Sequence, residues 1–196
     1  IPATFLDQLF LYHGGSSMTK ASGALGGIID LETRPYWSRR SGFSVGSELA
    51  SFGTYQGFAN LYLKKNSLIS NSRMFYNHSD NDYPFYNTSV LPHEEQRLQN
   101  SRYSKYGYLQ ELYYRIQSHD VLSVKLWLQR SDRDLPPPVS KEEIQTLEFQ
   151  ADRNIRSVIT WQHSGKSHEF QLSSGLTFDR INYLAEELST ENISLD

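Results

Sequence analysis

Cysteine is absent from this chain of 196 residues. Its absence excludes a disulfide framework and a thiolate metal site, and it leaves the redox compartment open. Long hydrophobic runs are also missing, because no stretch approaches the ~18 consecutive apolar residues that a membrane-spanning helix requires. Positive charge is not in excess either, since the formal net charge is −3. The sequence therefore offers no basic surface of the kind that predicts nucleic-acid binding.

Targeting and catalytic signatures are equally scarce. The first residues, Ile1-Pro2-Ala3-Thr4, lack the charged region of a signal peptide, so an exported protein with this sequence is expected to have lost its start. No His-Glu-x-x-His or Gly-x-Ser-x-Gly pattern occurs, and the six histidines are scattered. Without a Ser/His/Asp arrangement, a hydrolase is not favoured, and we expect no enzymatic activity.

Aromatic residues are abundant instead, with 13 Tyr and 10 Phe in a polar chain. Apolar and polar residues alternate with a period of two in many segments, which is typical of strands with one apolar face. In Val121–Arg130 this alternation places Leu122 and Leu126 opposite Lys125 and Gln129. Strands are predicted over Ser41–Ala50, Tyr55–Lys64, Leu68–Ser79, Lys105–Gln117, Val121–Arg130, Arg153–His163 and Ser167–Asp179.

The alternation also predicts which residues share a face of the sheet. One face is expected to meet lipid, and the other is expected to be the concave side. The first set is Leu122, Val124, Leu126, Leu128, Phe170, Leu172, Leu176 and Phe178. The second set is Lys125, Gln129, Glu169 and Gln171.

The connections between these strands alternate in length. Short turns are expected at Lys65-Asn66-Ser67, Ser118-His119-Asp120 and Ser164-Gly165-Lys166. Long polar connections are expected over about 80–103 and 131–148. Transmembrane barrels have short turns at one rim and long loops at the other, whereas a soluble sandwich has no reason to sort its loops in this way. The short connection at Ser51-Phe52-Gly53-Thr54 departs from the alternation.

The second long connection contains two competing signals. Three prolines, Pro136-Pro137-Pro138, indicate a loop. The following Ser140-Lys141-Glu142-Glu143 resembles a helical capping box, and Ile144, Leu147 and Ala151 follow at helical spacing. A short helix is therefore expected within this loop.

The first forty residues differ in composition from the rest of the chain. They contain several glycines between two apolar runs, Leu9–Tyr12 and Ile28–Leu31. The stretch Gly14-Gly15-Ser16-Ser17, followed by Ser22 to Thr33, resembles the end of the plug domain in TonB-dependent outer-membrane receptors. It departs from the family pattern at Gly15, where proline is usual, at Ala21, where glycine is usual, and at Asp30, where asparagine is usual. Phe10 also stands where the family often has an acidic residue. The residues that carry the resemblance are Gly14, Gly15, Ser16, Ser17, Gly23, Gly26, Gly27 and Thr33.

The resemblance implies an all-β fold. Residues 1–36 would be the C-terminal end of a plug domain, and residues 37–196 would be about seven strands of a transmembrane antiparallel β-barrel. The family's barrel has ~22 strands, so the chain is expected to be a fragment. By the resemblance, the fragment is expected to lack the N-terminal energy-coupling segment, which in the family carries the TonB box.

The resemblance also implies a function and partners. The expected function is uptake of an iron-siderophore or a cobalamin-like ligand across the outer membrane of a Gram-negative bacterium. Partners would be the TonB energy-coupling complex, outer-membrane lipid, a metal-chelate or corrinoid ligand and a surface lipoprotein. The alternative that the composition leaves open is a soluble β-sandwich that binds a carbohydrate or another ligand.

Ligand-binding candidates lie in the first long connection. Tyr83, Phe85, Tyr86 and Tyr103 offer the aromatic faces that would hold a bulky chelate or corrinoid. Packing within the loop and placement at a membrane interface are the competing explanations for these aromatics. Asp80 and Asp82 begin like a calcium loop, although no glycine or glutamate follows at EF-hand spacing. Calcium in an outer loop is implied by cobalamin-transporting relatives, so these two residues are the candidate metal ligands.

Overall fold

The computed structural model describes residues 5, 7–13, 27–140 and 146–187 of the chain. Within these residues the elements are all β-strands, labelled β1 to β11. None of the described residues forms a helix long and apolar enough to span a membrane. The chain divides into two compact units, residues 1–40 and 41–196.

The first unit contains one antiparallel hairpin. Strand β1 (Gln8–His13) pairs with β2 (Gly27–Glu32), in the register that joins Leu11 to Ile29. This agrees with the prediction of two apolar strands around a glycine-rich connection. Gly27 begins β2 opposite His13, and Thr33 directly follows β2. The remaining residues of the plug resemblance, Gly14, Gly15, Ser16, Ser17, Gly23 and Gly26, lie outside the described residues.

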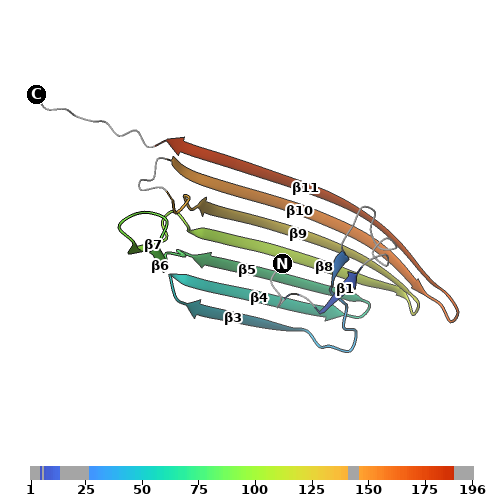
Figure 1. Ribbon diagram of the computed structural model, residues 1–196. Helices are drawn as coiled ribbons and strands as arrows, with labels where there is room; N and C mark the ends of the chain where they lie inside the picture. Colours follow the sequence, from blue (N-terminus) through green and yellow to red (C-terminus); the bar gives the residue numbers. More distant parts are fainter. Residues whose placement is uncertain (1–4, 6, 14–26, 141–145, 188–196) are drawn as a thin grey trace, which may run out of the picture. The chain divides into compact units, whose positions relative to one another are not determined.

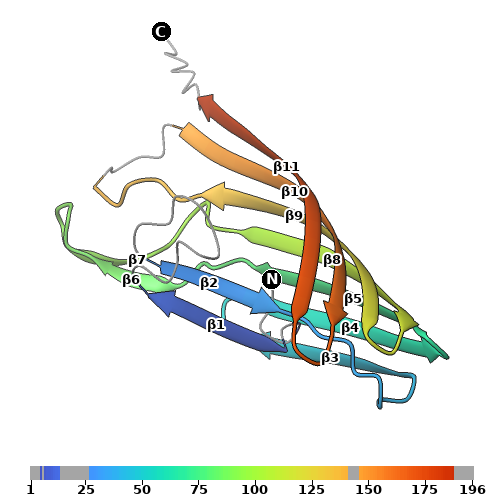
Figure 2. The ribbon, with the colours of Figure 1, turned by 90° about the vertical axis from the view of Figure 1, so that its right-hand side faces the viewer.

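The second unit is built on a seven-stranded antiparallel sheet (Figure 1). Its strands lie in the order β3-β4-β5-β8-β9-β10-β11. Their bounds are Gly42–Ala50 (β3), Thr54–Lys65 (β4), Leu68–Ser79 (β5), Tyr103–Gln117 (β8), Asp120–Leu135 (β9), Thr146–Ser164 (β10) and Glu169–Glu187 (β11). Figure 2 shows that β10 and β11 bend strongly along their length. The order follows the chain, apart from a two-stranded hairpin inserted between β5 and β8.

That hairpin lies in the first long connection, which was predicted to be a loop throughout. Strands β6 (Pro84–Asn87) and β7 (Glu94–Arg97) pair in the register that joins Phe85 to Gln96. The buried Asn87 fixes the hairpin to the second long connection, because its amide donates to the carbonyl oxygen of Val139 at 3.0 Å.

All seven predicted strands are present, and β8 and β9 pair as antiparallel neighbours across their short turn, as predicted. The last strands are longer than predicted. β9 continues to Leu135, β10 begins at Thr146 and β11 continues to Glu187. Polar residues interrupt the alternation in these extensions, but the backbone ladder continues through them, since Asp132 pairs with Ala151 and Asp152 with Ile181. Backbone hydrogen bonds between neighbouring strands do not depend on side-chain polarity.

The helix predicted around Ser140–Ala151 is wrong over the residues that can be assessed. Residues 146–151 belong to β10 and pair with β11, and residues 148–151 pair with β9 as well. Two ladders outweigh the weak local preference of a capping box. Residues 141–145 lie outside the described part of the chain.

The register separates the side chains of the sheet into two faces. Residues that pair directly point to the same side, so the row Leu68, Tyr114, Leu122, Trp161 and Leu172 belongs to one face. We call this the apolar face. All of the residues predicted to face lipid lie on it, and Leu172, Leu176 and Phe178 are more than half exposed. Lys125, Gln129, Glu169 and Gln171 lie on the opposite side, which we call the polar face.

Aromatic side chains border the apolar face at both ends. Toward the long connections these are Tyr55, Tyr76, Tyr106 and Tyr108. Toward the short turns they are Tyr114, Trp161 and Phe170. Aliphatic residues dominate between the two rows, although a few polar residues also lie there, namely Ser70, Ser72, Gln110, Ser157 and Ser174. There, Gln110 accepts hydrogen bonds from Ser72 and Tyr108, both at 2.6 Å, and donates one to Ser70 at 3.0 Å.

The polar face contains a buried charged cluster on β5, β8 and β9. The carboxylate of Glu111 has no exposed surface. It accepts hydrogen bonds from Asn71 at 3.0 Å and from Tyr113 at 2.8 Å. The guanidinium of Arg73 lies 3.5 Å from it, and the Lys125 ammonium lies 3.9 Å from it. A buried carboxylate needs this number of donors and cations to offset the loss of water.

The connections are sorted by length between the two ends of the sheet. Residues 66–67, 118–119 and 165–168 form the short turns at one end. Residues 80–102 and 136–140 belong to the long connections at the other end. The short connection at residues 51–53 also lies at the long-connection end. Phe52 and Gly53 there have φ angles of 59° and 63°, as in the tight two-residue turns that suit hairpins.

Candidate functional site

A pocket of about 540 Å³ opens at the long-connection end of the sheet. Four segments contribute to it: the β5–β6 connection, the β7–β8 connection, the end of β9 and the start of β10. Its lining consists of Asp80, Asp82, Leu98, Gln99, Asn100, Ser101, Arg102, Asp134 and Leu147. Three carboxylates and one guanidinium make this lining acidic.

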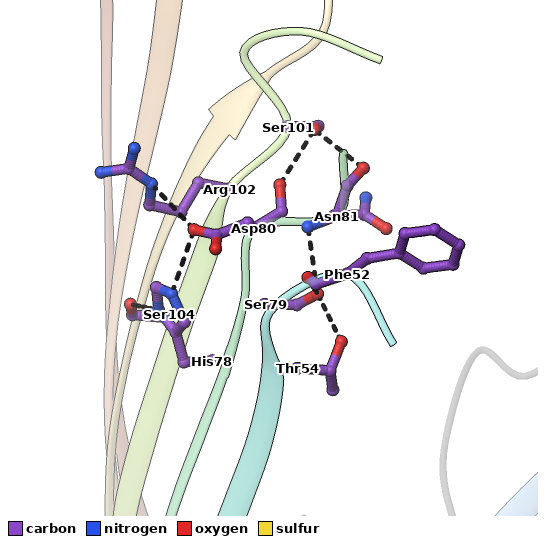
Figure 3. A network of polar contacts seen from close by, with 9 residues as sticks. All are labelled: Phe52, Thr54, His78, Ser79, Asp80, Asn81, Ser101, Arg102 and Ser104. Carbon is purple, nitrogen blue, oxygen red and sulfur yellow. Dashed lines mark hydrogen bonds and ion pairs between the residues drawn. The ribbon is translucent and has the colours of Figure 1, made fainter. Parts of the chain in front are cut away.

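The β5–β6 connection is held by backbone and hydroxyl groups (Figure 3). Asn81 adopts a φ of 55°, a conformation that asparagine tolerates well. Its backbone N–H donates to the carbonyl oxygen of Phe52 at 3.2 Å and to the Ser79 hydroxyl at 3.1 Å. The buried Ser101 hydroxyl donates to the carbonyl oxygens of Asp80 at 3.2 Å and Asn81 at 3.0 Å. The backbone at Asp80 and Asn81 is therefore held from both sides.

Both carboxylates predicted as metal ligands face basic groups. Asp80 lies 3.6 Å from Arg102 and 3.5 Å from the His78 ring nitrogen, as Figure 3 shows. Asp82 pairs with Arg97 at 2.7 Å. A calcium ion at these residues would have to displace the basic partners. Among the described residues, no group of three or more acidic or histidine side chains is placed to hold a metal ion.

Asn100 connects the lining of the pocket to the sheet through hydrogen bonds. Its φ is 51°, and its side-chain amide donates to the carbonyl oxygens of Leu135 at 2.7 Å and Glu148 at 3.1 Å. These oxygens belong to the end of β9 and the start of β10, so one side chain joins both strands to the β7–β8 connection. The sequence analysis did not single out Asn100. The turn-forming run Gln99-Asn100-Ser101 was the available signal.

The four predicted aromatic ligands are not brought together at the pocket. Tyr83 packs edge-on against Phe52, with ring centroids 6.2 Å apart. Phe85 and Tyr86 are consecutive in β6 and so point to opposite sides of the hairpin, where the Tyr86 hydroxyl donates to the carbonyl oxygen of His93 at 3.2 Å. Tyr103 begins β8 on the polar face. None of the four lines the pocket, whereas Asp80 and Asp82 both do.

In comparisons with known proteins, no family model matches the chain, and no curated protein matches it significantly.

Proposed function

We propose that this chain is part of the wall of an outer-membrane β-barrel receptor that takes up a metal chelate or a cobalamin-like ligand in a TonB-dependent manner. The observation that carries the proposal is the two-faced sheet. Its apolar face is exposed and bordered by aromatic side chains at both ends, and its polar face carries a buried charged cluster. In a barrel wall, one face meets hydrocarbon and the other meets a polar interior.

The distance between the charged residues at the two ends of the apolar face supports placement in a membrane. On the apolar face of β9, Asp120 lies at the short-turn end and Arg130 at the long-connection end. These ten positions correspond to roughly 34 Å along a strand. A strand tilted by ~40° would rise about 26 Å over that length, which agrees with the ~25 Å apolar band of outer-membrane barrels.

A soluble β-sandwich is less compatible with the same face. A sandwich buries the apolar side of its sheet against a second sheet. Here Leu176 is 78% exposed and Leu172 is 60% exposed. An exposed apolar surface that runs across seven strands would cause aggregation in water. Hydrocarbon chains of lipid would cover it without requiring a second sheet.

The pocket at the long-connection end of the sheet, lined by Asp80, Asp82 and Asp134, is where we propose that the ligand first binds. Loops at the long-connection end of a receptor face the outside, and acidic and amide side chains there would hydrogen-bond to polar edges of the cargo. The plug resemblance in residues 14–33 supports gating by a plug and coupling to the TonB complex. Neither role requires catalysis by the chain.

Uptake assays in the bacterium that encodes the chain test this proposal. Cells that lack the gene, or that lack TonB, should lose accumulation of labelled iron chelate or of labelled cobalamin. A complementing copy with Asp80→Asn and Asp82→Asn should restore less uptake than a copy with Glu95→Gln, an exposed residue of β7 outside the pocket. Unchanged uptake of every tested cargo in the deletion strain would refute the proposal.

A further inference from the structure

Three arginines lie side by side on the apolar face at its long-connection border. Arg130 on β9 is paired directly with Arg153 on β10, which is paired directly with Arg180 on β11. Directly paired residues in an antiparallel sheet have Cβ atoms about 4.5–5.5 Å apart, so like charges in this position destabilise the sheet. We call Arg130, Arg153 and Arg180 the arginine row. The row requires a compensating anion.

The protein supplies little of this compensation. Asp132 pairs with Arg130 at 2.8 Å. Arg180 donates to the side-chain oxygen of Asn182 at 3.2 Å, which is a neutral partner. Within the part of the chain that the structure describes, neither Arg153 nor Arg180 forms an ion pair. The row therefore carries three positive charges against one negative charge.

Arginines on the polar face of the same strands, in contrast, form ion pairs with carboxylates. Arg133 on β9 pairs with Asp152 at 2.8 Å, and Arg156 on β10 lies 3.8 Å from Asp179. Each has a carboxylate partner on a neighbouring strand. The absence of such partners for Arg153 and Arg180 distinguishes the arginine row from the general charge pattern of the sheet.

The row directly adjoins the aliphatic band. Leu128, Ile155 and Phe178 are paired across the same three strands and lie two positions from the three arginines, on the side of the short turns. Two positions correspond to about 7 Å along a strand. If the apolar face meets hydrocarbon, as the proposed function requires, the guanidinium groups lie at the depth of lipid headgroups. Guanidinium groups bind phosphate oxygens in pairs of parallel hydrogen bonds.

We infer that the arginine row is a binding site for a phosphorylated lipid headgroup. The inference rests on the proposed membrane placement, and it adds a specific ligand on the outer wall of the sheet. At the short-turn end, Asp120 and His163 occupy the corresponding border and are bonded to each other at 2.9 Å. The structure thus assigns the phosphate site to the leaflet on the long-connection side.

The test counts lipids bound to the chain by native mass spectrometry, after reconstitution into phosphatidylcholine vesicles and release into detergent. The vesicles contain phosphatidic acid, phosphatidylserine or diacylglycerol as the added lipid. Mass resolves each assembly of the chain, so lipids are counted per chain. We expect preferential retention of phosphatidic acid, because its terminal phosphate accepts bidentate hydrogen bonds from arginine.

The decisive variant combines Arg153→Gln with Arg180→Gln. Each arginine near a membrane surface contributes about 1 kcal/mol, so phosphatidic acid binding should fall about thirtyfold. The matched control combines Arg133→Gln with Arg156→Gln, which removes the same charge from the polar face and should leave binding unchanged. Replacing Arg153 and Arg180 by lysine keeps the charge and should restore part of the binding.

Equal retention of all three lipids, or equal loss in both double variants, would overturn the inference. Competition by inorganic phosphate would also overturn it, since that result assigns the row to free phosphate. Flotation of the vesicles with the chain separates this failure from failure of the proposed function. A chain that floats with vesicles but shows no lipid preference contradicts only the arginine row, whereas a chain that does not float contradicts the membrane placement itself.

Discussion

Glu111 has no exposed surface although it is an acidic residue on a β-strand. Its carboxylate accepts hydrogen bonds from Asn71 and Tyr113, and it lies 3.5 Å from Arg73 and 3.9 Å from Lys125. These contacts join β5, β8 and β9 through their side chains, in addition to the backbone ladders. The cluster is therefore a specific stabilising feature of the polar face.

Removal of the Glu111 charge should destabilise the sheet. In Glu111→Gln, the buried Arg73 loses the carboxylate that lies 3.5 Å from it, and removing one partner of a buried ion pair costs about 3–5 kcal/mol. We expect a decrease of about 3 kcal/mol in the free energy of unfolding, measured by denaturant titration in detergent micelles. Glu95→Gln on exposed β7 is the control and should change stability by less than about 0.5 kcal/mol. Equal stability of the two variants would contradict the role of Glu111.

Gly53 is required for two separate reasons. Its φ of 63° lies in the left-handed region that disfavours a side chain, and a Cβ at this position would overlap the carboxylate of Asp80. Gly53→Ala should therefore destabilise the sheet by at least the ~1–2 kcal/mol of left-handed strain and should displace Asp80 from Arg102. Gly42→Ala is the control, because no atom lies within 4 Å of its added Cβ. A Gly53→Ala melting temperature equal to that of Gly42→Ala would contradict this account.

The candidate site could be predicted from the sequence only in part. Asp80 and Asp82 were singled out from their spacing, and both line the pocket. Tyr83 was chosen for its aromatic ring, but it packs against Phe52, which is distant in the sequence. Asn100 donates hydrogen bonds to the carbonyl oxygens of Leu135 and Glu148. These residues are so distant in the sequence that no local pattern could predict the contacts. The acidic residues of the pocket could be identified from neighbouring residues in the sequence. The positions of Tyr83 and Asn100 depend on contacts with residues that are distant in the sequence.

At the scale of the elements, β9 is the strand that separates the two environments most clearly. Leu126 lies on the apolar face between Gln110 and Ser157, and Gln129 lies on the polar face between Gly107 and Asn154. If the apolar face meets lipid, as the proposed function requires, a charge added at position 126 would enter hydrocarbon, whereas a charge added at position 129 would enter a polar environment.

Two arginine substitutions on β9 test this difference. Leu126→Arg should lower the free energy of unfolding by about 2–4 kcal/mol, the cost of arginine at the bilayer midplane. Gln129→Arg adds the same charge to the same strand and should cost less than about 1 kcal/mol. The measurement is thermal unfolding of the reconstituted chain in lipid vesicles. Equal costs at the two positions would count against lipid contact on the apolar face.

The sequence predicted the existence of the strands better than their ends. Alternation located β8 and β9 and their short turn, because one face is apolar over most of their length. It failed at Thr146–Ala151, which pairs with β11 throughout and with β9 from Glu148 onward, despite a helical spacing of Ile144, Leu147 and Ala151. It also missed the β6–β7 hairpin, whose four-residue strands are too short to display a period. Ladder pairing is set by neighbouring strands, so a local pattern cannot reveal where it stops.

At the scale of the whole molecule, the sheet has two outer edges. Within the described residues, β3 and β11 each pair with one neighbour only. β11 has 19 residues, so its outer edge is a long row of backbone groups. In hydrocarbon each unpaired backbone group costs several kcal/mol, which favours pairing with another strand.

The edges lead to a prediction about assembly. The chain of 196 residues, expressed alone and refolded into detergent, should aggregate or form oligomers through β3 and β11. Sedimentation velocity in detergent measures the assembly state over a range of protein concentrations. A monodisperse, heat-resistant monomer would instead indicate a domain that is stable without further strands.

Side-chain accessibility along β9 in vesicles tests the central claim most directly. Because the chain has no cysteine, single cysteines can be introduced at successive positions from Val124 to Gln129 and labelled with a nitroxide. Oxygen, which concentrates in hydrocarbon, and a water-soluble nickel chelate then report the environment of each label by electron paramagnetic resonance. We predict alternation with a period of two, with labels at 124, 126 and 128 accessible to oxygen and protected from nickel, and the reverse at 125 and 129. Equal nickel accessibility on both faces, or protection of the apolar-face labels from both reagents, would contradict a lipid-facing sheet.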